Sequence, residues 1–140
     1  MNREMPDRAV AHLPEWETTR AIIDCFYKVY NGLGYGFLES VYRRALEQEL
    51  LRAGLTVARE VAVEVFYQRQ SVGMFRLDLL VEHRVAVELK ATPVLGHTDR
   101  RQLLNYLRAT SLDVGLLLHF GPQPKFHRIV SPRIMQTMGE

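Results

Sequence analysis

The chain has 140 residues and a mass of 16.2 kDa, enough for one domain and hardly for two. Apolar residues make up 47% and charged residues 24%, a composition that excludes a mostly disordered protein. The 18 basic and 16 acidic side chains give a net charge of +2, which is compatible with nucleic-acid binding but does not require it.

The cysteine content and the apolar runs exclude several further classes. Cys25 is the single cysteine, so an intrachain disulfide and a multi-cysteine zinc site are both excluded. No apolar run approaches the roughly 18 residues of a membrane-spanning helix. The N-terminal residues contain no apolar core of the signal-peptide type. We therefore expect a soluble cytoplasmic protein without a membrane partner.

The N-terminal third predicts two helices. Residues 1–14 contain two prolines and mixed charge without a period, and we expect them to form a loose lead-in. A helical stripe then begins at Glu15 and includes Ile22, Cys25 and Phe26. Three glycines at 32, 34 and 36 interrupt it, and a second helix begins at residue 37 or 38 and stops at Gly54.

Alternating side chains follow and predict three strands. The first runs over residues 57–67 with one continuous alternation of faces, and residues 68–71 form a turn. The second runs over residues 72–82. The third is VAVELKA at residues 85–91, which is apolar apart from two charges.

The C-terminal half predicts a helix and one or two more strands. Residues 97–111 have helical spacing, VGLLLHF at 114–120 suits a buried central strand, and residues 125–130 suit an edge strand. The last residues, 131–140, form a tail. The order of elements predicts an α/β fold in which a central mixed sheet of four or five strands is flanked by helices, in a single domain over residues 15–130.

The strand at residues 85–91 carries the clearest chemical signal. Glu88 and Lys90 are two residues apart, so their side chains lie on the same face. A strand this apolar is expected in the sheet interior, where two charges on one face need a use. A solvated face carrying a Glu/Lys pair is the alternative interpretation.

Asp78, in the preceding strand, favours a shared site. In an antiparallel pair, Asp78 lies opposite Glu88 if Val81 faces Val85. It lies opposite Lys90 if the register is shifted by two residues. Both registers need a three-residue turn, and both bring the three charged groups to one face.

Two carboxylates and an ammonium on one sheet face suit phosphodiester hydrolysis. Mg²⁺ takes oxygen ligands, often one or two carboxylates together with waters and substrate phosphate. Such a cation activates water and neutralises charge on the phosphoryl group. A lysine beside it can orient the water or stabilise the transition state.

Four motifs in order carry a resemblance to a known family. GFLESVY at residues 36–42 spells G-x-x-E-x-x-Y, and it is followed by RLDLLVEHRVAVELKA, QLLNYLRAT and VGLLLHFG. With these motifs, residues 19–130 resemble the GxxExxY family of the PD-(D/E)XK nuclease superfamily. The resemblance implies a restriction-endonuclease-like core.

The resemblance also implies roles for individual residues. Asp78 and Glu88 resemble the metal-binding acids, and Lys90 resembles the catalytic lysine. Glu39 resembles a helix glutamate that joins the metal site directly or through water, so all four would be catalytic. The implied cofactor is Mg²⁺ or Mn²⁺.

The predicted helix at residues 97–111 supplies candidates for nucleic-acid binding. Gln102 and Tyr106 match the family's Q-x-x-x-Y motif, and their i, i+4 spacing places them on one helix face. Without the other motifs, a helix boundary between core and water is the alternative interpretation. Arg100 and Arg101 adjoin Gln102 and are candidates for gripping phosphates.

The sequence departs from the family in three places. Leu77 stands where the superfamily's name has a proline, Tyr30 where members often have a histidine, and Tyr35 where members often have a proline between two glycines. The five histidines show no ligand spacing, so we expect no zinc site.

Together these observations predict a divalent-metal-dependent nuclease that hydrolyses phosphodiester bonds of nucleic acid, with DNA favoured over RNA. The alternative is a non-catalytic module on the same fold that binds nucleic acid or a protein partner, because a fold does not fix a function. A chelator separates the two, since cleavage must stop without metal whereas binding need not.

Overall fold

A computed structural model describes residues 14–134 of the chain. The helices are α2 (Trp16–Leu33), α3 (Glu39–Arg52) and α4 (His97–Ala109). The strands are β1 (Val57–Tyr67), β2 (Gln70–Val81), β3 (Val85–Lys90), β4 (Val114–Phe120) and β5 (Pro124–Val130). The order of helices and strands agrees with the order predicted from the sequence.

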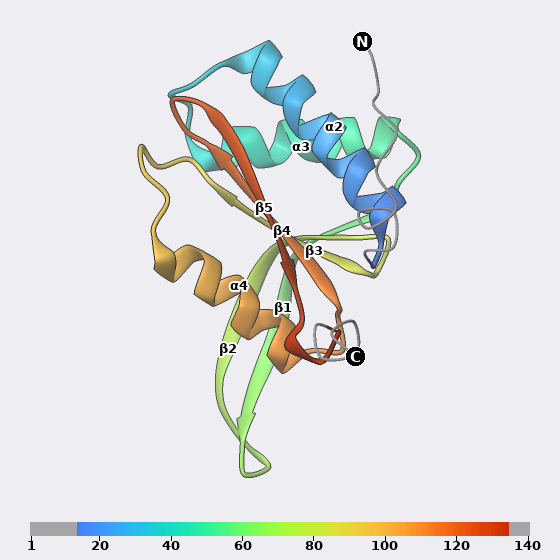
Figure 1. Ribbon diagram of the computed structural model, residues 1–140, viewed down its shortest axis with the longest axis vertical. Helices are drawn as coiled ribbons and strands as arrows, with labels where there is room; N and C mark the ends of the chain where they lie inside the picture. The colour runs from blue at the N-terminus through green and yellow to red at the C-terminus, as the bar shows by residue number, and fades with distance from the viewer. Residues whose placement is uncertain (1–13, 135–140) are drawn as a thin grey trace.

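The five strands form one mixed sheet in the order β1-β2-β3-β4-β5. The β3–β4 pair is parallel and the other neighbouring pairs are antiparallel. The connection from β3 to β4 crosses over through α4, as parallel pairing requires. Figure 1 shows that the β1–β2 hairpin extends well beyond the rest of the sheet.

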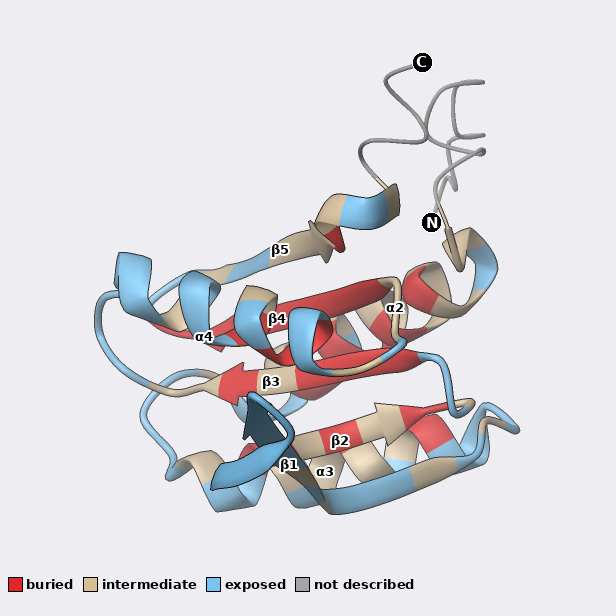
Figure 2. Cartoon of the chain, turned by 90° about the horizontal axis from the view of Figure 1, so that it is seen from below, coloured by how far each residue is buried: buried red, intermediate tan, exposed pale blue. Residues whose placement is uncertain are grey.

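The sheet is covered by helices on both faces. On one face, α2 and α3 pack against β2, β3 and β4 through the larger core cluster, which includes Phe26, Tyr42 and Phe120. On the other face, α4 packs through Leu103, Tyr106 and Leu107. β3 and β4 are therefore the most buried strands, whereas the projecting hairpin is mostly exposed (Figure 2).

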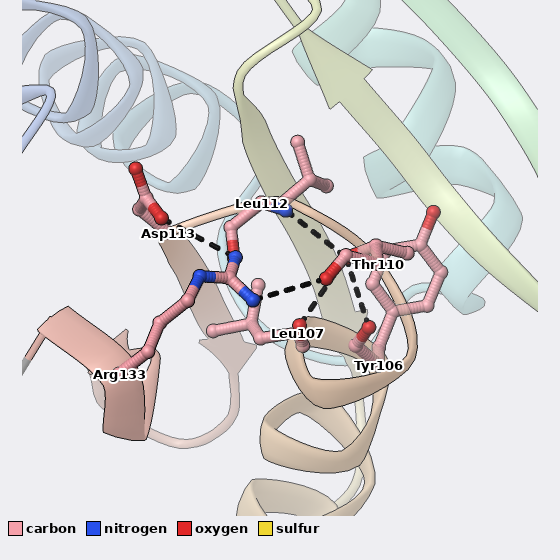
Figure 3. Close-up of polar contacts among 6 residues, drawn as sticks. All are labelled: Tyr106, Leu107, Thr110, Leu112, Asp113 and Arg133. Atoms are coloured by element: carbon pink, nitrogen blue, oxygen red, sulfur yellow. Dashed lines mark hydrogen bonds and ion pairs between the residues drawn. The ribbon is translucent and has the colours of Figure 1, made fainter.

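Glycine permits the close packing of α4 on the sheet. A Cβ atom at Gly115 of β4 would lie 3.0 Å from a methyl carbon of Leu103. The end of α4 is fixed by Arg133, which donates hydrogen bonds to the carbonyl oxygens of Thr110 and Leu112 (Figure 3). Arg133 also pairs with Asp113 at 3.3 Å. These contacts fasten the segment after β5 to the turn that leads from α4 into β4.

The structure corrects some of the predicted boundaries and one predicted pattern. The second helix begins at Glu39 rather than at residue 37 or 38, and β2 begins at Gln70, so the hairpin turn is shorter than predicted. The continuous alternation predicted for residues 57–67 is wrong, because Val57 packs in the α2/α3 cluster whereas Val61 packs in the α4 cluster. The predicted lead-in and tail lie largely outside the described residues.

Candidate active site

The interior strand β3 places two charged side chains beneath α4. Val85, Val87 and Leu89 belong to the core cluster under α2 and α3, and Ala86 belongs to the cluster under α4. Strict alternation therefore directs Glu88 and Lys90 to the α4 side of the sheet. The Lys90 Nζ lies 3.9 Å from the Asp99 Oδ1 on α4, which agrees with this direction.

The turn between β2 and β3 sets the register of the site. It is a three-residue turn, residues 82–84, in which Glu82 and His83 have positive φ angles of 53° and 58°. Val81 pairs with Val85 and Leu79 with Val87, so Asp78 is the residue opposite Glu88. This is one of the two registers that the sequence allowed.

The regular alternation of β2 breaks at Asp78. Leu77 packs under α4, but Leu79 packs under α2 and α3. On β1 the matching break falls at Glu60, which has a left-handed φ of 51° and interrupts the pairing with β2. The backbone pairing between β2 and β3 ends at Leu79. Beyond this residue, hydrogen bonds between backbone N–H groups and side chains connect the two strands.

The Asp78 and Glu88 carboxylates lie side by side where the ladder ends. The Asp78 backbone N–H donates to the Glu88 Oε1 at 3.0 Å, and the Leu89 N–H donates to the Asp78 Oδ2 at 2.8 Å. Burial is the largest cause, and the charge of the neighbouring Asp78 the second, that together raise the pKa of Glu88 to about 8. Without a cation, this arrangement favours a protonated Glu88.

Glu39 is the first residue of α3 and faces the same cluster. Burial is the largest cause that raises its pKa, followed by the charge of Asp78, while Lys90 and Arg43 act in the opposite direction. The side chain of Glu39 is thus close enough to interact electrostatically with Asp78 and Lys90. All three predicted acids lie in one region, although they come from a helix and two strands.

The G-x-x-E-x-x-Y segment has a local structural explanation. Gly36 has a φ of 111°, which L side chains rarely adopt. The Tyr42 hydroxyl donates to the Gly34 carbonyl oxygen and accepts from the Phe37 N–H, so it ties down the loop before the helix. Its ring is fully buried and stacks on Phe120 at a centroid distance of 4.2 Å. Tyr42 therefore fixes the loop that positions Glu39.

Two residues that the sequence analysis missed also belong to this cluster. Arg43 lies one helical turn after Glu39, and its Nη1 is 3.8 Å from the Asp78 Oδ1. Asp99 lies in the first turn of α4 and pairs with Lys90. The i, i+4 spacing from Glu39 was the sequence signal for Arg43. The position of Asp99 in the first turn of the helix after β3 was the signal for that residue.

The four candidates on α4 do not share one environment. Tyr106 is only 2% exposed, and its ring packs against the Phe75 ring at a centroid distance of 5.3 Å. The pKa of the Tyr106 hydroxyl is raised, chiefly by burial and also by the charge of Glu88. This near-complete burial gives Tyr106 a packing role, and its contact with nucleic acid stays a prediction. Gln102, Arg100 and Arg101 are exposed. Their role in nucleic-acid binding stays a prediction.

The donor set suits a hard divalent cation, although it is not a closed metal cage. Among residues 14–134, no group of three or more acidic, histidine or cysteine side chains is arranged to hold an ion. Two adjacent carboxylates are nevertheless a common protein contribution to a Mg²⁺ site, since waters and substrate phosphate complete it. The pKa of Glu88 is raised first by burial and then by the Asp78 charge, and a cation bound beside both carboxylates would favour their ionised forms. The residues present therefore fit the group.

No helix in the described part of the chain is both long enough and apolar enough to cross a membrane.

Among the curated proteins, none matches this chain. A solved structure described as "Crystal structure of SSO0001" is similar in fold, with a TM-score of 0.55 at 18% sequence identity over 83% of this chain. The match covers 62% of that protein, so this chain spans less than two thirds of its length.

A family model gives the more decisive comparison. The model described as "PD-(D/E)XK nuclease superfamily" matches residues 16–129, which include every helix and nearly every strand residue of the structure. Members of this superfamily typically depend on a metal ion. Because this match covers most of the chain, and because the mixed sheet with its flanking helices is consistent with that fold, the chain belongs to the PD-(D/E)XK nuclease superfamily.

Proposed function

We propose that the protein is a divalent-metal-dependent nuclease that hydrolyses phosphodiester bonds. The observation that supports this most is the adjacency of the Asp78 and Glu88 carboxylates in the sheet interior, with Lys90 on the same strand as Glu88. Placing such charges in the interior costs folding free energy, so a functional use is the reasonable explanation.

The proposed roles follow from position and charge. Asp78 and Glu88 would hold Mg²⁺ or Mn²⁺, and Glu39 would join them directly or through water. The cation would polarise the phosphoryl oxygens and make water a better nucleophile. Lys90 would supply a fixed positive charge toward the oxygens on which charge develops, and its 3.9 Å contact with Asp99 would hold the ammonium in place.

Within the superfamily, we propose that the chain belongs to the GxxExxY branch. This proposal is supported by the glycine, glutamate and tyrosine of the G-x-x-E-x-x-Y motif, each of which has its own structural role in this protein. Gly36 adopts a positive φ, Glu39 begins α3 beside Asp78, and Tyr42 anchors the loop.

The test is a cleavage assay of purified protein on labelled DNA and RNA, each single- and double-stranded. We expect cleavage of DNA with Mg²⁺ or Mn²⁺ and none with EDTA. Asp78→Asn should lose cleavage at every metal concentration, whereas Asp24→Asn on α2 serves as the control. Cleavage that persists in EDTA would contradict the proposal.

A binding-only function on the same fold is the second candidate. It is favoured by the internal counter-ions of the cluster, since Arg43 lies 3.8 Å from Asp78 and Lys90 lies 3.9 Å from Asp99. These pairs offset part of the negative charge without a metal. If this candidate is correct, labelled DNA binds equally well in Mg²⁺ and in EDTA and is recovered intact.

A further inference from the structure

A charged cavity lies between α3 and β1, next to the candidate active site. Its volume is about 290 Å³, and it is lined by three arginines and two glutamates: Arg43, Arg44, Glu47, Arg59 and Glu60. The positive charges exceed the negative charges by one. None of these residues belongs to the set that the sequence analysis assigned.

Within residues 14–134, the arginine donors of this cavity make no close internal contact. The closest N···O distances are 3.8 Å for Arg43 with Glu60 and 3.9 Å for Arg59 with Glu47, beyond the roughly 2.7–3.2 Å of a good hydrogen bond. Arg44 is exposed and has no ion pair within residues 14–134. Guanidinium groups whose donors are not taken up by close hydrogen bonds can bind phosphate, because their planar donors pair with its oxygens.

The cavity is linked directly to the acidic cluster. Arg43 lines it and also lies 3.8 Å from the Asp78 Oδ1, so one side chain borders both places. Glu60, at the strand break opposite Asp78, reaches Arg43 at 3.8 Å and Arg76 at 3.9 Å. Its left-handed φ of 51° is unfavourable for a residue with a side chain, and such local strain is concentrated at functional sites.

We propose that this cavity binds a backbone phosphate of the nucleic acid, close along the strand to the phosphate that is cleaved. The inference rests on the proposed nuclease function and adds a substrate contact to it. Glu47 and Glu60 weaken the attraction for a small isolated anion. A strand that places several phosphates along the surface at once overcomes this, since each neutralised phosphate releases counterions.

The test uses the double variant Arg44→Gln/Arg59→Gln. Arg43 is left intact because it contacts Asp78, and Arg52→Gln is the control, since Arg52 is a 73% exposed arginine near the other end of the same helix. Steady-state cleavage of a fluorescein-labelled 20-base-pair DNA is measured with Mg²⁺ from 50 to 200 mM KCl. We expect KM to rise at least about tenfold in the double variant, with kcat within about twofold of wild type.

The salt dependence gives a second, independent readout. Loss of the contact with this phosphate should reduce the slope of log KM against log salt by about 1, whereas Arg52→Gln should keep the wild-type slope. Thermal melting should be unchanged in both variants, because the substituted side chains are exposed.

The outcomes separate this inference from the proposed function. If wild type cleaves no nucleic acid, the proposed function is wrong and this inference fails with it. If wild type cleaves but the double variant keeps its KM and salt slope, only the cavity assignment is wrong. A fall in kcat at constant KM also overturns it. Polyglutamate gives a further outcome that overturns the inference. If polyglutamate inhibits wild type but not the double variant, and the KM of the double variant for DNA is unchanged, the cavity is assigned to an acidic protein partner.

Discussion

Glu88 shows how one residue can connect stability with function. It lies on an interior strand, and its carboxylate accepts the N–H of Asp78 in place of a ladder bond. Burial and the Asp78 charge hold its pKa near 8, so the metal-free protein keeps a proton there over most of the neutral range. A cation bound between the two acids would displace that proton.

The raised pKa of Glu88 predicts a specific pH dependence of stability. The unfolded chain releases this proton near the ordinary value of 4.5, whereas the folded protein releases it near 8. Between these pH values the folded state binds more protons than the unfolded state. The contribution of Glu88 to the free energy of unfolding therefore falls as pH rises and is lowest above pH 8. Glu39, whose pKa is also raised, acts in the same direction.

Glu88→Gln should therefore remove most of this dependence. In EDTA, we expect the variant to be more stable than wild type at pH 8.5, on the order of a few kcal/mol, and close to wild type at pH 4. Urea unfolding at both pH values measures this, with the exposed Glu64→Gln as the matched control. Mg²⁺ should stabilise wild type but not the Gln variant. Equal wild-type and variant stability at pH 8.5 would argue against a shared, desolvated acid site.

At the scale of elements, the loop before α3 and its first turn act as one unit. Gly36 supplies the unusual backbone conformation, and Tyr42 fastens the loop through the Gly34 carbonyl oxygen and the Phe37 N–H. Because Glu39 is the first residue of the helix, its position depends on this loop. The loop is thus a positioning device for one acid of the site.

Tyr42→Phe tests that dependence. The substitution keeps the ring on Phe120 but removes both hydrogen bonds, so we expect a loss of about 1–2 kcal/mol in stability. Cleavage at saturating substrate should fall severalfold even where the variant is fully folded, because Glu39 is held less firmly. Urea unfolding and cleavage rates provide the measurement, and Tyr35→Phe in the same loop is the control. A variant with wild-type activity would separate Tyr42 from the site.

The sequence narrowed the pairing of β2 and β3 to two registers, because a three-residue turn in either one brings Asp78, Glu88 and Lys90 to one face. The structure has the Val81–Val85 register. The break at Asp78 could not be predicted in this way. It depends on Glu60 in the neighbouring strand adopting a positive φ, and on contacts between residues that are far apart in sequence.

Arg43 and Asp99 escaped the sequence analysis for a related reason. Charged residues in the first turns of helices are common, because they favour helix formation and solvation without any role in a site. Only the packing of α3 and α4 against opposite faces of the sheet brings Arg43 to Asp78 on β2 and Asp99 to Lys90 on β3. The burial of Tyr106 between α4 and the sheet could likewise not be inferred from its place in the motif.

At the scale of the whole molecule, the candidate site sits where elements from both faces of the sheet meet. Glu39 and Arg43 come from α3 on one side, Asp99 comes from α4 on the other, and the sheet supplies the remaining acids and Lys90. The arginine-lined cavity lies on the α3 side, and the exposed arginines of α4 lie on the other. Under the proposed function, a bound strand would contact the arginines on both sides.

Lys90 provides the most direct test of the central claim that these residues form a working metal-dependent nuclease site. The measurement is the Mg²⁺-dependent cleavage rate of wild type, Lys90→Ala and Lys90→Arg, each paired with thermal melting. Lys28→Ala, an exposed lysine on α2, is the control.

Lys90 is three-quarters buried, and among residues 14–134 its closest ion pair is the long 3.9 Å contact with Asp99, so its removal should leave the melting temperature nearly unchanged. Cleavage should nevertheless fall by about a hundred- to a thousandfold, because no other group replaces the ammonium where charge develops. Arginine should restore little, since its planar fork is a different donor. A folded Lys90→Ala protein that cleaves at the wild-type rate would contradict the account.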